Sequence, residues 1–359
     1  MSAPALPGAV GPAGATTTAV RPARVVEARD VADGVRRVVL EHAPGRPAEP
    51  GAHLQLVVHV DGPGGRRREV RSYSVVDASP DGTRSAISVL LTPTSRGGGR
   101  YVHSLSAGDD VECSAPLQGF PLRLGAGRYH LVAGGIGITA LVAMARHLAA
   151  RGADVVLDHV VRTRSRAAYA DDLAALLGDR YRLHVDDEHG AFDVGALLDE
   201  VAAADGDGEG AVPGGAEAYV CGPIRLMDAV RRGWEARGLP ASTLRFETFG
   251  SSGWYAPQPF TACIPEIGLR TTVGPDTTLL EALQRAGADL MYDCRKGECG
   301  LCRIDVASVR GVLDHRDVFL SRRQQEAGTS MCVCVSRVAA LPAAQGGDGQ
   351  PAELVLRLP

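Results

Sequence analysis

A set of cysteines near the carboxyl end constrains this chain more than any other feature. Cys294, Cys299 and Cys302 follow the spacing Cys-x4-Cys-x2-Cys, and Cys332 and Cys334 come about 30 residues later. This spacing is typical of the plant-type [2Fe–2S] cluster, in which four thiolates converge on two irons. A zinc site would instead favour paired CxxC spacing. Glycines in the loop let backbone amides approach the sulfides. The sequence therefore predicts an iron–sulfur site.

The fourth ligand of this site is either Cys334 or Cys332. The run Cys334-Val335-Ser336-Arg337 best fits the end of a cluster-binding loop, so we predict Cys334. If both cysteines lie on one strand, they point the same way, because side chains alternate between the two faces. Cys332 would then lie close enough to act as a substitute.

Length and composition indicate a multidomain globular protein. A chain of 359 residues predicts two to three domains, and a net charge of −4 gives no sign of a nucleic-acid or anionic-membrane partner. No apolar run approaches the ~18 residues of a membrane-spanning helix. The first 22 residues are rich in Ala, Pro, Gly and Thr, lack the features of a signal peptide and predict a disordered tail. We therefore expect a cytoplasmic protein whose cysteines are metal ligands or buried thiols rather than disulfides.

The pattern along the chain divides it into three domains. Residues 23–125 contain short β-branched runs separated by turn-rich segments at 44–52 and 61–68, as in a small antiparallel barrel. Residues 126–249 alternate strands with helices, which predicts a doubly wound parallel sheet of the α/β class. Residues 250–259 are expected to form a linker, and residues 260–359 a mixed α+β domain.

Local signals mark a helix start and two surface segments. Thr278 and Glu281 have the spacing of a capping box, so a helix is predicted to begin there. The stretches 205–215 and 343–350 are rich in Gly, Asp and Ala and are interpreted as low-complexity surface segments.

Two motifs in the first domain predict a flavin site. In the run RSYS, the tyrosine suits the isoalloxazine ring, and its neighbours suit the ribityl chain and phosphate of a flavin mononucleotide. A second run, SRGGGR, offers an arginine fork and bare backbone amides to a phosphate. The candidate flavin-binding residues are Arg71, Ser72, Tyr73, Ser74, Arg96, Gly97, Gly98 and Gly99.

Two motifs in the second domain predict a nicotinamide site. GGIGIT follows one strand and opens a helix, and CGP ends another strand of the same sheet. Carboxyl ends of strands gather at the cofactor in such sheets, and helix N-termini attract anions. Three arginines at 162, 164 and 166 would suit the extra phosphate of NADPH or a solvated loop, and we favour NADH. The candidate residues are Gly134, Gly135, Gly137, Thr139, Cys221, Gly222 and Pro223.

The ordered motifs RSYS, SRGGGR, GGIGIT, CGP, FETFG, CRKGECGLC, DHRDVFL and CVSR resemble the phthalate dioxygenase reductase and vanillate O-demethylase reductase family. The resemblance covers the chain from about residue 23 to its end. It implies a barrel that binds FMN, a NAD domain and a C-terminal ferredoxin domain of the β-grasp fold, in that order. It also implies a partner, a terminal oxygenase with a Rieske cluster.

The resemblance also implies roles for individual residues. In FETFG, which matches the family's FESFG, Glu247 and Phe249 lie where an aromatic side chain packs against the flavin, with Phe246 as the competing aromatic. Thr139 and Cys221 are the candidate catalytic residues beside the nicotinamide. Gly99 stands where the family usually has serine, which keeps FAD open as an alternative to FMN.

Together these features predict a monomeric reductase that passes electrons from NADH to FMN, then to the [2Fe–2S] cluster and on to a Rieske-type oxygenase. One alternative is an FAD-containing reductase of the same layout that serves a cytochrome P450. Another is a redox sensor or carrier without catalytic activity. Arg295 and Lys296 make the cluster loop basic, which suggests a docking surface for an acidic partner.

Overall fold

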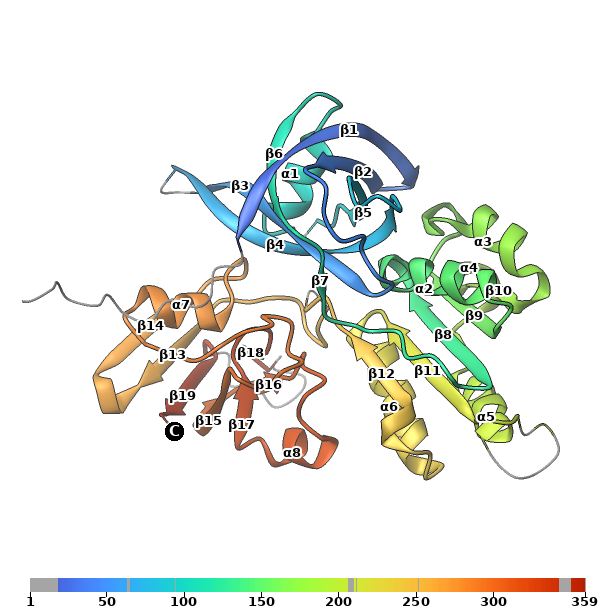
Figure 1. The fold of residues 1–359 in the computed structure, drawn as a ribbon. Coiled ribbons are helices and arrows are strands. Elements are labelled where there is room, and N and C mark those ends of the chain that lie inside the picture. The colour runs from blue at the N-terminus through green and yellow to red at the C-terminus, as the bar shows by residue number, and fades with distance from the viewer. Residues whose placement is uncertain are drawn as a thin grey trace, which may run out of the picture.

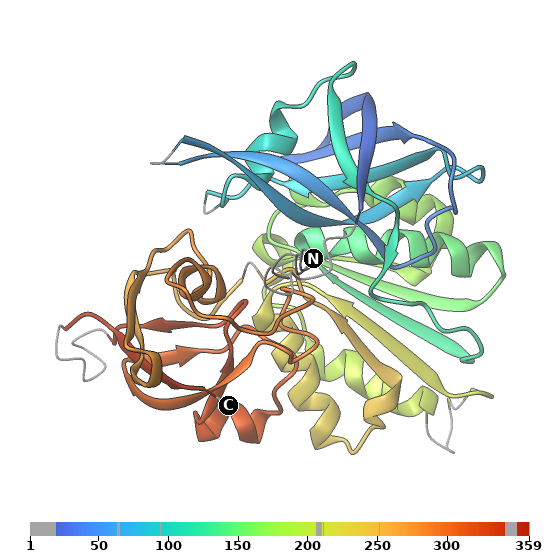
Figure 2. The same cartoon turned by 60° about the vertical axis from the view of Figure 1, so that its left-hand side comes forward.

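The computed structural model describes residues 19–358 apart from 63–64, 94, 206–209, 211, 251 and 342–349. Most of the predicted tail and large parts of the two low-complexity segments therefore lie outside the described residues. Within the described part of the chain, no helix is long and apolar enough to cross a membrane. The fold has three modules, each built on its own sheet, and Figures 1 and 2 show the first above the other two.

The first module, here called the barrel, is an antiparallel sheet in the order β4-β5-β2-β1-β6-β3-β7, closed by pairing of β3 with β4. Alternating apolar residues of these strands fill its interior, with Leu40, Leu54, Leu56 and Ile87 fully buried. Its elements are β1 Val20–Ala32, β2 Val35–His42, β3 Ala52–Gly62, β4 Gly65–Ala78, β5 Arg84–Leu90, α1 Gly98–Ser104, β6 Asp110–Ser114 and β7 Leu117–Gln118.

The second module, the α/β module, is a five-stranded parallel sheet in the order β10-β9-β8-β11-β12. The strand order reverses between β8 and β11, so the carboxyl ends of these two strands flank a crevice. Its elements are β8 Arg128–Gly134, α2 Ile138–Ala150, β9 Asp154–Val161, α3 Ala170–Leu177, β10 Tyr181–Val185, α4 Asp186–His189, α5 Val194–Asp205, β11 Ala216–Cys221, α6 Ile224–Ala236 and β12 Leu244–Glu247.

The third module, the cysteine module, has a mixed sheet in the order β14-β13-β19-β15-β17 with helix α7 packed on it. This arrangement matches the predicted β-grasp class. Its elements are β13 Phe260–Ile264, β14 Leu269–Val273, α7 Leu279–Arg285, β15 Arg303–Arg310, β16 Val312–Asp314, α8 Arg322–Ala327, β17 Ser330–Cys332, β18 Arg337–Ala339 and β19 Glu353–Arg357.

One hydrophobic cluster joins the barrel to the α/β module. Val76 and Ala86 of the barrel belong to the same buried cluster as Leu141 and Met144 of α2. The Arg146 guanidinium adds a hydrogen bond to the Val76 carbonyl at 3.1 Å. Because the two modules share buried apolar surface, we expect them to behave as one rigid body.

The structure corrects three local predictions. Strand β1 begins at Val20, inside the predicted tail, because residues 20–24 pair with β6. The segment 61–68, expected to be a turn, is mostly strand, since the β3–β4 ladder continues to Gly62 and Gly65. Cys332 ends β17 whereas Cys334 lies in the following turn, so strand alternation does not relate these two cysteines.

The predicted start of α7 is confirmed: the Thr278 hydroxyl accepts from the Glu281 amide, and the Glu281 carboxylate accepts from the Thr278 amide. We expect Thr278→Ala to remove the cap at a cost of about 1 kcal/mol. Amide hydrogen exchange at the start of α7 should then accelerate about fivefold. Thr278→Ser keeps the hydroxyl and is the control. Equal exchange in both variants would contradict the role of the cap.

Candidate functional site

A cavity of about 460 Å³ lies where the three modules meet, a volume suited to a cofactor. Its walls come from β4 and the α1 region of the barrel, from the ends of β8 and β11, and from loops of the cysteine module. It brings together most of the residues predicted to bind flavin or nicotinamide. Those that line it are Arg71, Ser72, Tyr73, Ser74, Arg96, Gly98, Gly99, Gly134, Gly135, Gly137, Thr139, Gly222, Pro223 and Phe249.

The barrel wall of the cavity is shaped by a close approach between α1 and β4. A Cβ atom on Gly98 would lie 2.7 Å from the Tyr73 hydroxyl oxygen and 3.1 Å from Cγ of Arg71, so any larger residue would displace them. Burial raises the pKa of Tyr73 to about 12, which keeps its hydroxyl neutral. The glycine run thus lets α1 pack onto the RSYS strand.

Four arginines line the same cavity, and their charges are incompletely paired: Arg71, Arg96, Arg316 and Arg337. Among the described residues, Arg96 has no hydrogen-bond or ion-pair partner, and Nε of Arg337 is buried without one. Burial, followed by repulsion from Arg71, lowers the pKa of Arg96. Burial, followed by repulsion from Arg316 and Arg96, lowers that of Arg337 to about 10. An anion bound here would relieve this repulsion, so the residues present fit the phosphate of a flavin nucleotide.

The α/β wall is formed where the β8–α2 turn meets the end of β11. A Cβ atom on Gly137 would lie 2.0 Å from the Cys221 carbonyl oxygen, and one on Gly134 would lie 2.5 Å from the Pro223 ring. These two glycines are therefore required for contact between the strand ends, whereas Gly135 has open space beside it. The buried Thr139 hydroxyl donates to the Ile136 carbonyl at 2.9 Å, which fixes the turn.

Four of the predicted residues do not line the cavity. Cys221 is fully buried, and burial, followed by the nearby Glu247 carboxylate, raises its pKa well above the usual value, so the thiol stays protonated. Phe246 packs instead against the α5–α6 side of the sheet, so the cavity aromatic of this segment is Phe249. Gly97 and Glu247 are the other two, and Glu247 is buried behind the wall.

Behind that wall, a polar network links all three modules. The Ser74 hydroxyl donates to one oxygen of Glu247 at 3.1 Å, and the Lys296 ammonium donates to the other at 2.7 Å. Burial alone would lower the pKa of Lys296, but the carboxylates of Glu247 and Glu298 outweigh it and raise that pKa. Lys296 is therefore an internal ion-pair partner, which corrects the prediction that it forms a docking surface with Arg295.

The predicted cluster loop folds around the Cys294 sulfur. The backbone amides of Lys296, Glu298 and Cys299 each donate to it at 3.4 Å. Gly297 takes a left-handed conformation that lets successive amides point the same way. A hydrogen bond from Cys334 lowers the pKa of Cys294 to about 4. Burial acts in the opposite direction, and the three amides help to lower the pKa. The loop is thus arranged to stabilise a thiolate.

Both candidates for the fourth ligand lie near the loop. The Cys334 thiol interacts with Cys294 and Cys302, whereas the Cys332 thiol interacts with Cys302. No group of three or more His, Cys, Asp or Glu side chains in the described residues is gathered to hold a single metal ion. The fit to a two-iron cluster therefore rests on cysteine spacing and loop amides, and the contacts of Cys334 favour it as the ligand.

Sequence reasoning missed the residues that the cysteine module contributes to the cavity. Arg316, Arg337 and Val335 line it, although they lie more than 200 residues from the RSYS motif. Lys296 and Glu298 were likewise not linked to Glu247. A usable signal was the arginine inside DHRDVFL and the one closing CVSR, because an arginine beside an apolar run is buried only when it is paired.

The arginine-lined cavity, the crevice of a doubly wound sheet and the cysteine loop together define an electron-transfer reductase of the flavin and iron–sulfur type. Comparisons with known proteins agree. Residues 265–339 match the family model of the 2Fe-2S iron-sulfur cluster binding domain. The putative toluene-4-sulfonate monooxygenase system reductase subunit of Comamonas testosteroni is 36% identical over 324 residues, covering 88% of this chain and 95% of the relative.

The phthalate dioxygenase reductase of Burkholderia cepacia is 35% identical, covering 82% of this chain and 86% of the relative. This chain belongs to the phthalate dioxygenase reductase family. A solved structure titled phthalate dioxygenase reductase, a modular structure for electron transfer from pyridine nucleotides to [2Fe–2S], superposes with a TM-score of 0.67 at 30% identity, covering 94% and 98% of the two chains. An intact self-sufficient cytochrome P450 monooxygenase matches with a TM-score of 0.58 at 31% identity, over 94% of this chain and 41% of that one.

The arginine assignment can be tested by flavin binding. Arg96→Met should weaken FMN binding at least tenfold, because a charged hydrogen bond to phosphate contributes about 1.5–3 kcal/mol. The measurement is fluorescence quenching as FMN is titrated into flavin-depleted protein. Arg68→Met is the matched control, since Arg68 is exposed, pairs with Glu112 and lies outside the cavity wall. Equal affinity in the two variants would disprove the phosphate site.

Proposed function

We propose that this protein is the NADH-dependent reductase of a Rieske-type oxygenase system, passing electrons from NADH through FMN and a [2Fe–2S] cluster to the oxygenase. One observation carries the proposal: a single cavity is lined by the RSYS strand, the crevice of the α/β module and Val335, the neighbour of Cys334. Hydride donor, flavin and cluster would therefore meet at one place. The dioxygenase and demethylase systems of the relatives support the class of partner.

The chain's residues would divide the work as follows. Arg71 and Arg96 would hold the flavin phosphate, with Tyr73 along the ring. The β8–α2 turn has open space beside Gly135, and the nicotinamide would bind there. The flavin supplies the conversion of a two-electron hydride into single electrons, and the protein supplies placement and exclusion of water.

Direction follows from the usual potentials of the two kinds of cluster. Plant-type clusters lie near about −400 mV, and Rieske centres lie between about −150 and +300 mV. A gap of roughly 250 mV corresponds to about four decades in equilibrium constant for one electron. Delivery to a Rieske acceptor is therefore downhill.

A second acceptor is favoured by one specific comparison, the match to the self-sufficient cytochrome P450 over nearly the whole of this chain. Chromatography of the released flavin distinguishes FMN from FAD. Parallel assays with a Rieske oxygenase and a P450 then separate the two kinds of acceptor, and a preference for P450 would replace the proposal. Negligible NADH turnover with every acceptor would instead indicate a redox carrier without catalytic activity.

The whole chain of carriers can be tested in one anaerobic titration. NADH should bleach both the flavin and the iron–sulfur absorbance at about 1.5 equivalents per protein, since the two centres together accept three electrons. NADPH at the same concentration should act more slowly. Bleaching of the flavin bands alone would contradict a connected cluster.

Replacing one predicted cluster ligand should separate the two halves of the reaction. Cys299→Ser should abolish reduction of an oxygenase or cytochrome while leaving NADH-driven dye reduction within about twofold, because the flavin and nicotinamide walls do not include Cys299. Steady-state assays with both acceptors measure this. Cys263→Ser on β13 is the control and should retain both activities. Loss of both activities in a folded Cys299→Ser protein would argue against separate roles.

A further inference from the structure

We propose that Lys296 is a positioning residue whose buried ion pair with Glu247 fixes the cluster loop against the other two modules and thereby sets the rate of flavin-to-cluster electron transfer. The electron-transfer part rests on the function proposed above. The structural part, a closed interface held by this pair, stands on the contacts alone.

Both partners of the ion pair are withdrawn from solvent. The Lys296 side chain is 13% exposed and the Glu247 side chain 1%, and their charged atoms lie 2.7 Å apart. Because the second oxygen of Glu247 accepts from Ser74, this one carboxylate connects the end of β12, the RSYS strand and the cluster loop. A buried charge that loses its partner is strongly disfavoured, so the pair holds the loop in one place.

A second contact from the same loop strengthens the attachment. The Glu298 carboxylate accepts from the Thr248 amide at 2.8 Å, so alternate loop residues bind consecutive residues of the segment that leaves β12. The amides of Lys296 and Glu298 also donate to the Cys294 sulfur. The residues that anchor the loop are thus the ones that surround a predicted ligand, and a shift of the anchor would move that ligand relative to the cavity.

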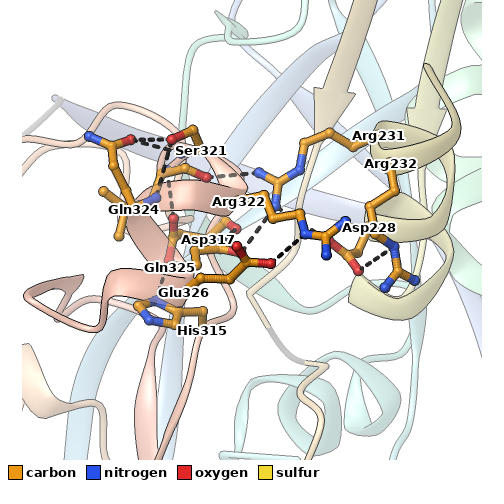
Figure 3. Close-up of polar contacts among 11 residues, drawn as sticks. Asp228, Arg231, Arg232, His315, Asp317, Ser321, Arg322, Gln324, Gln325 and Glu326 are labelled. Carbon is orange, nitrogen blue, oxygen red and sulfur yellow. Dashed lines mark hydrogen bonds and ion pairs between the residues drawn. The ribbon is translucent and has the colours of Figure 1, made fainter. Parts of the chain in front are cut away.

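The α/β module and the cysteine module also touch at a second place, on the segment after β16 whose Val318 amide donates to the Gly297 carbonyl of the cluster loop at 3.0 Å. There Arg231 of α6 donates to the Leu320 carbonyl at 2.8 Å and to the Gln325 side chain at 3.1 Å, beside helix α8 (Figure 3). Neither Arg231 nor its partners line the cavity. Arg231 contacts neither Lys296 nor Glu247, so replacing Arg231 removes a docking contact between the same modules while keeping the ion pair, and it provides the control.

The chain itself offers a direct probe, because Lys296 is its only lysine. Acetylation of the purified holoprotein with an N-hydroxysuccinimide ester, followed by mass spectrometry of the peptide containing residue 296, reports on this one ε-amine. We expect acetylation at least tenfold slower than in urea-unfolded protein. Glu247→Gln should remove most of that protection, and Arg231→Met should keep it. Acetylation of the native protein at the unfolded rate would overturn the buried pair.

The kinetic consequence is measured by stopped-flow mixing with NADH, following flavin and cluster absorbance separately. Lys296→Met should slow cluster reduction at least tenfold while flavin reduction changes less than threefold, and Lys296→Arg should recover part of the loss. Arg231→Met should leave both rates unchanged. Equal slowing of both steps, or of neither, would overturn the positioning role.

The two measurements fail in different ways. If the wild-type protein does not reduce a cluster at all, the proposed function is wrong, and the acetylation result still decides whether the ion pair closes the interface. If electrons reach the cluster normally in Lys296→Met while acetylation is slow, the pair closes the interface but does not set the transfer rate.

Discussion

The cysteine module is held against the rest of the molecule by buried polar contacts, and the shared cavity depends on this attachment. The barrel and the α/β module need no such device, because Val76 and Leu141 lie in one apolar cluster. Across the other boundary, Lys296, Glu247 and Glu298 supply the closest contacts near the cavity. Removing one partner of a buried ion pair leaves an uncompensated charge, so the pair specifies one relative position. An electron-transfer interface gains from that specificity.

The two kinds of junction suggest different mobility within one chain. A shared apolar core opens only at the full cost of exposing it. A polar interface resists small shifts, which leave buried charges without partners, whereas full separation returns those charges to water. The loops between β12 and β13, which contain no described helix or strand, would permit such separation. The cysteine module is therefore the part best able to present its cluster to an outside acceptor and to return to the cavity.

The sequence predicted those parts of the site whose signal is local. Each of these signals depends on residues close together in the sequence: the cysteine spacing, the glycine turn of GGIGIT and the Thr278 cap. The long-range parts were not accessible, since nothing near Lys296 indicates Glu247, and nothing in CVSR indicates that Arg337 lines the same cavity as the RSYS strand. The prediction that Lys296 forms a docking surface was wrong for a physical reason. A charged loop residue is usually solvated, and only the fold shows that a carboxylate lies beside this one. Cys221 illustrates the same limit, because position at a strand end did not reveal complete burial.

The cavity also explains why a chain with a single lysine can still build an anion site. A guanidinium stays charged even where burial and neighbouring cations lower its pKa, as at Arg337, where the value of about 10 remains well above neutrality. A lysine in the same place would start from a lower pKa and lose its charge more easily. Arginines of the barrel and of the cysteine module can therefore be crowded around one cavity without being neutralised. Their mutual repulsion opposes closure of the empty cavity, and a bound phosphate would convert that repulsion into attraction, so that cofactor binding and docking of the cysteine module on the barrel reinforce each other.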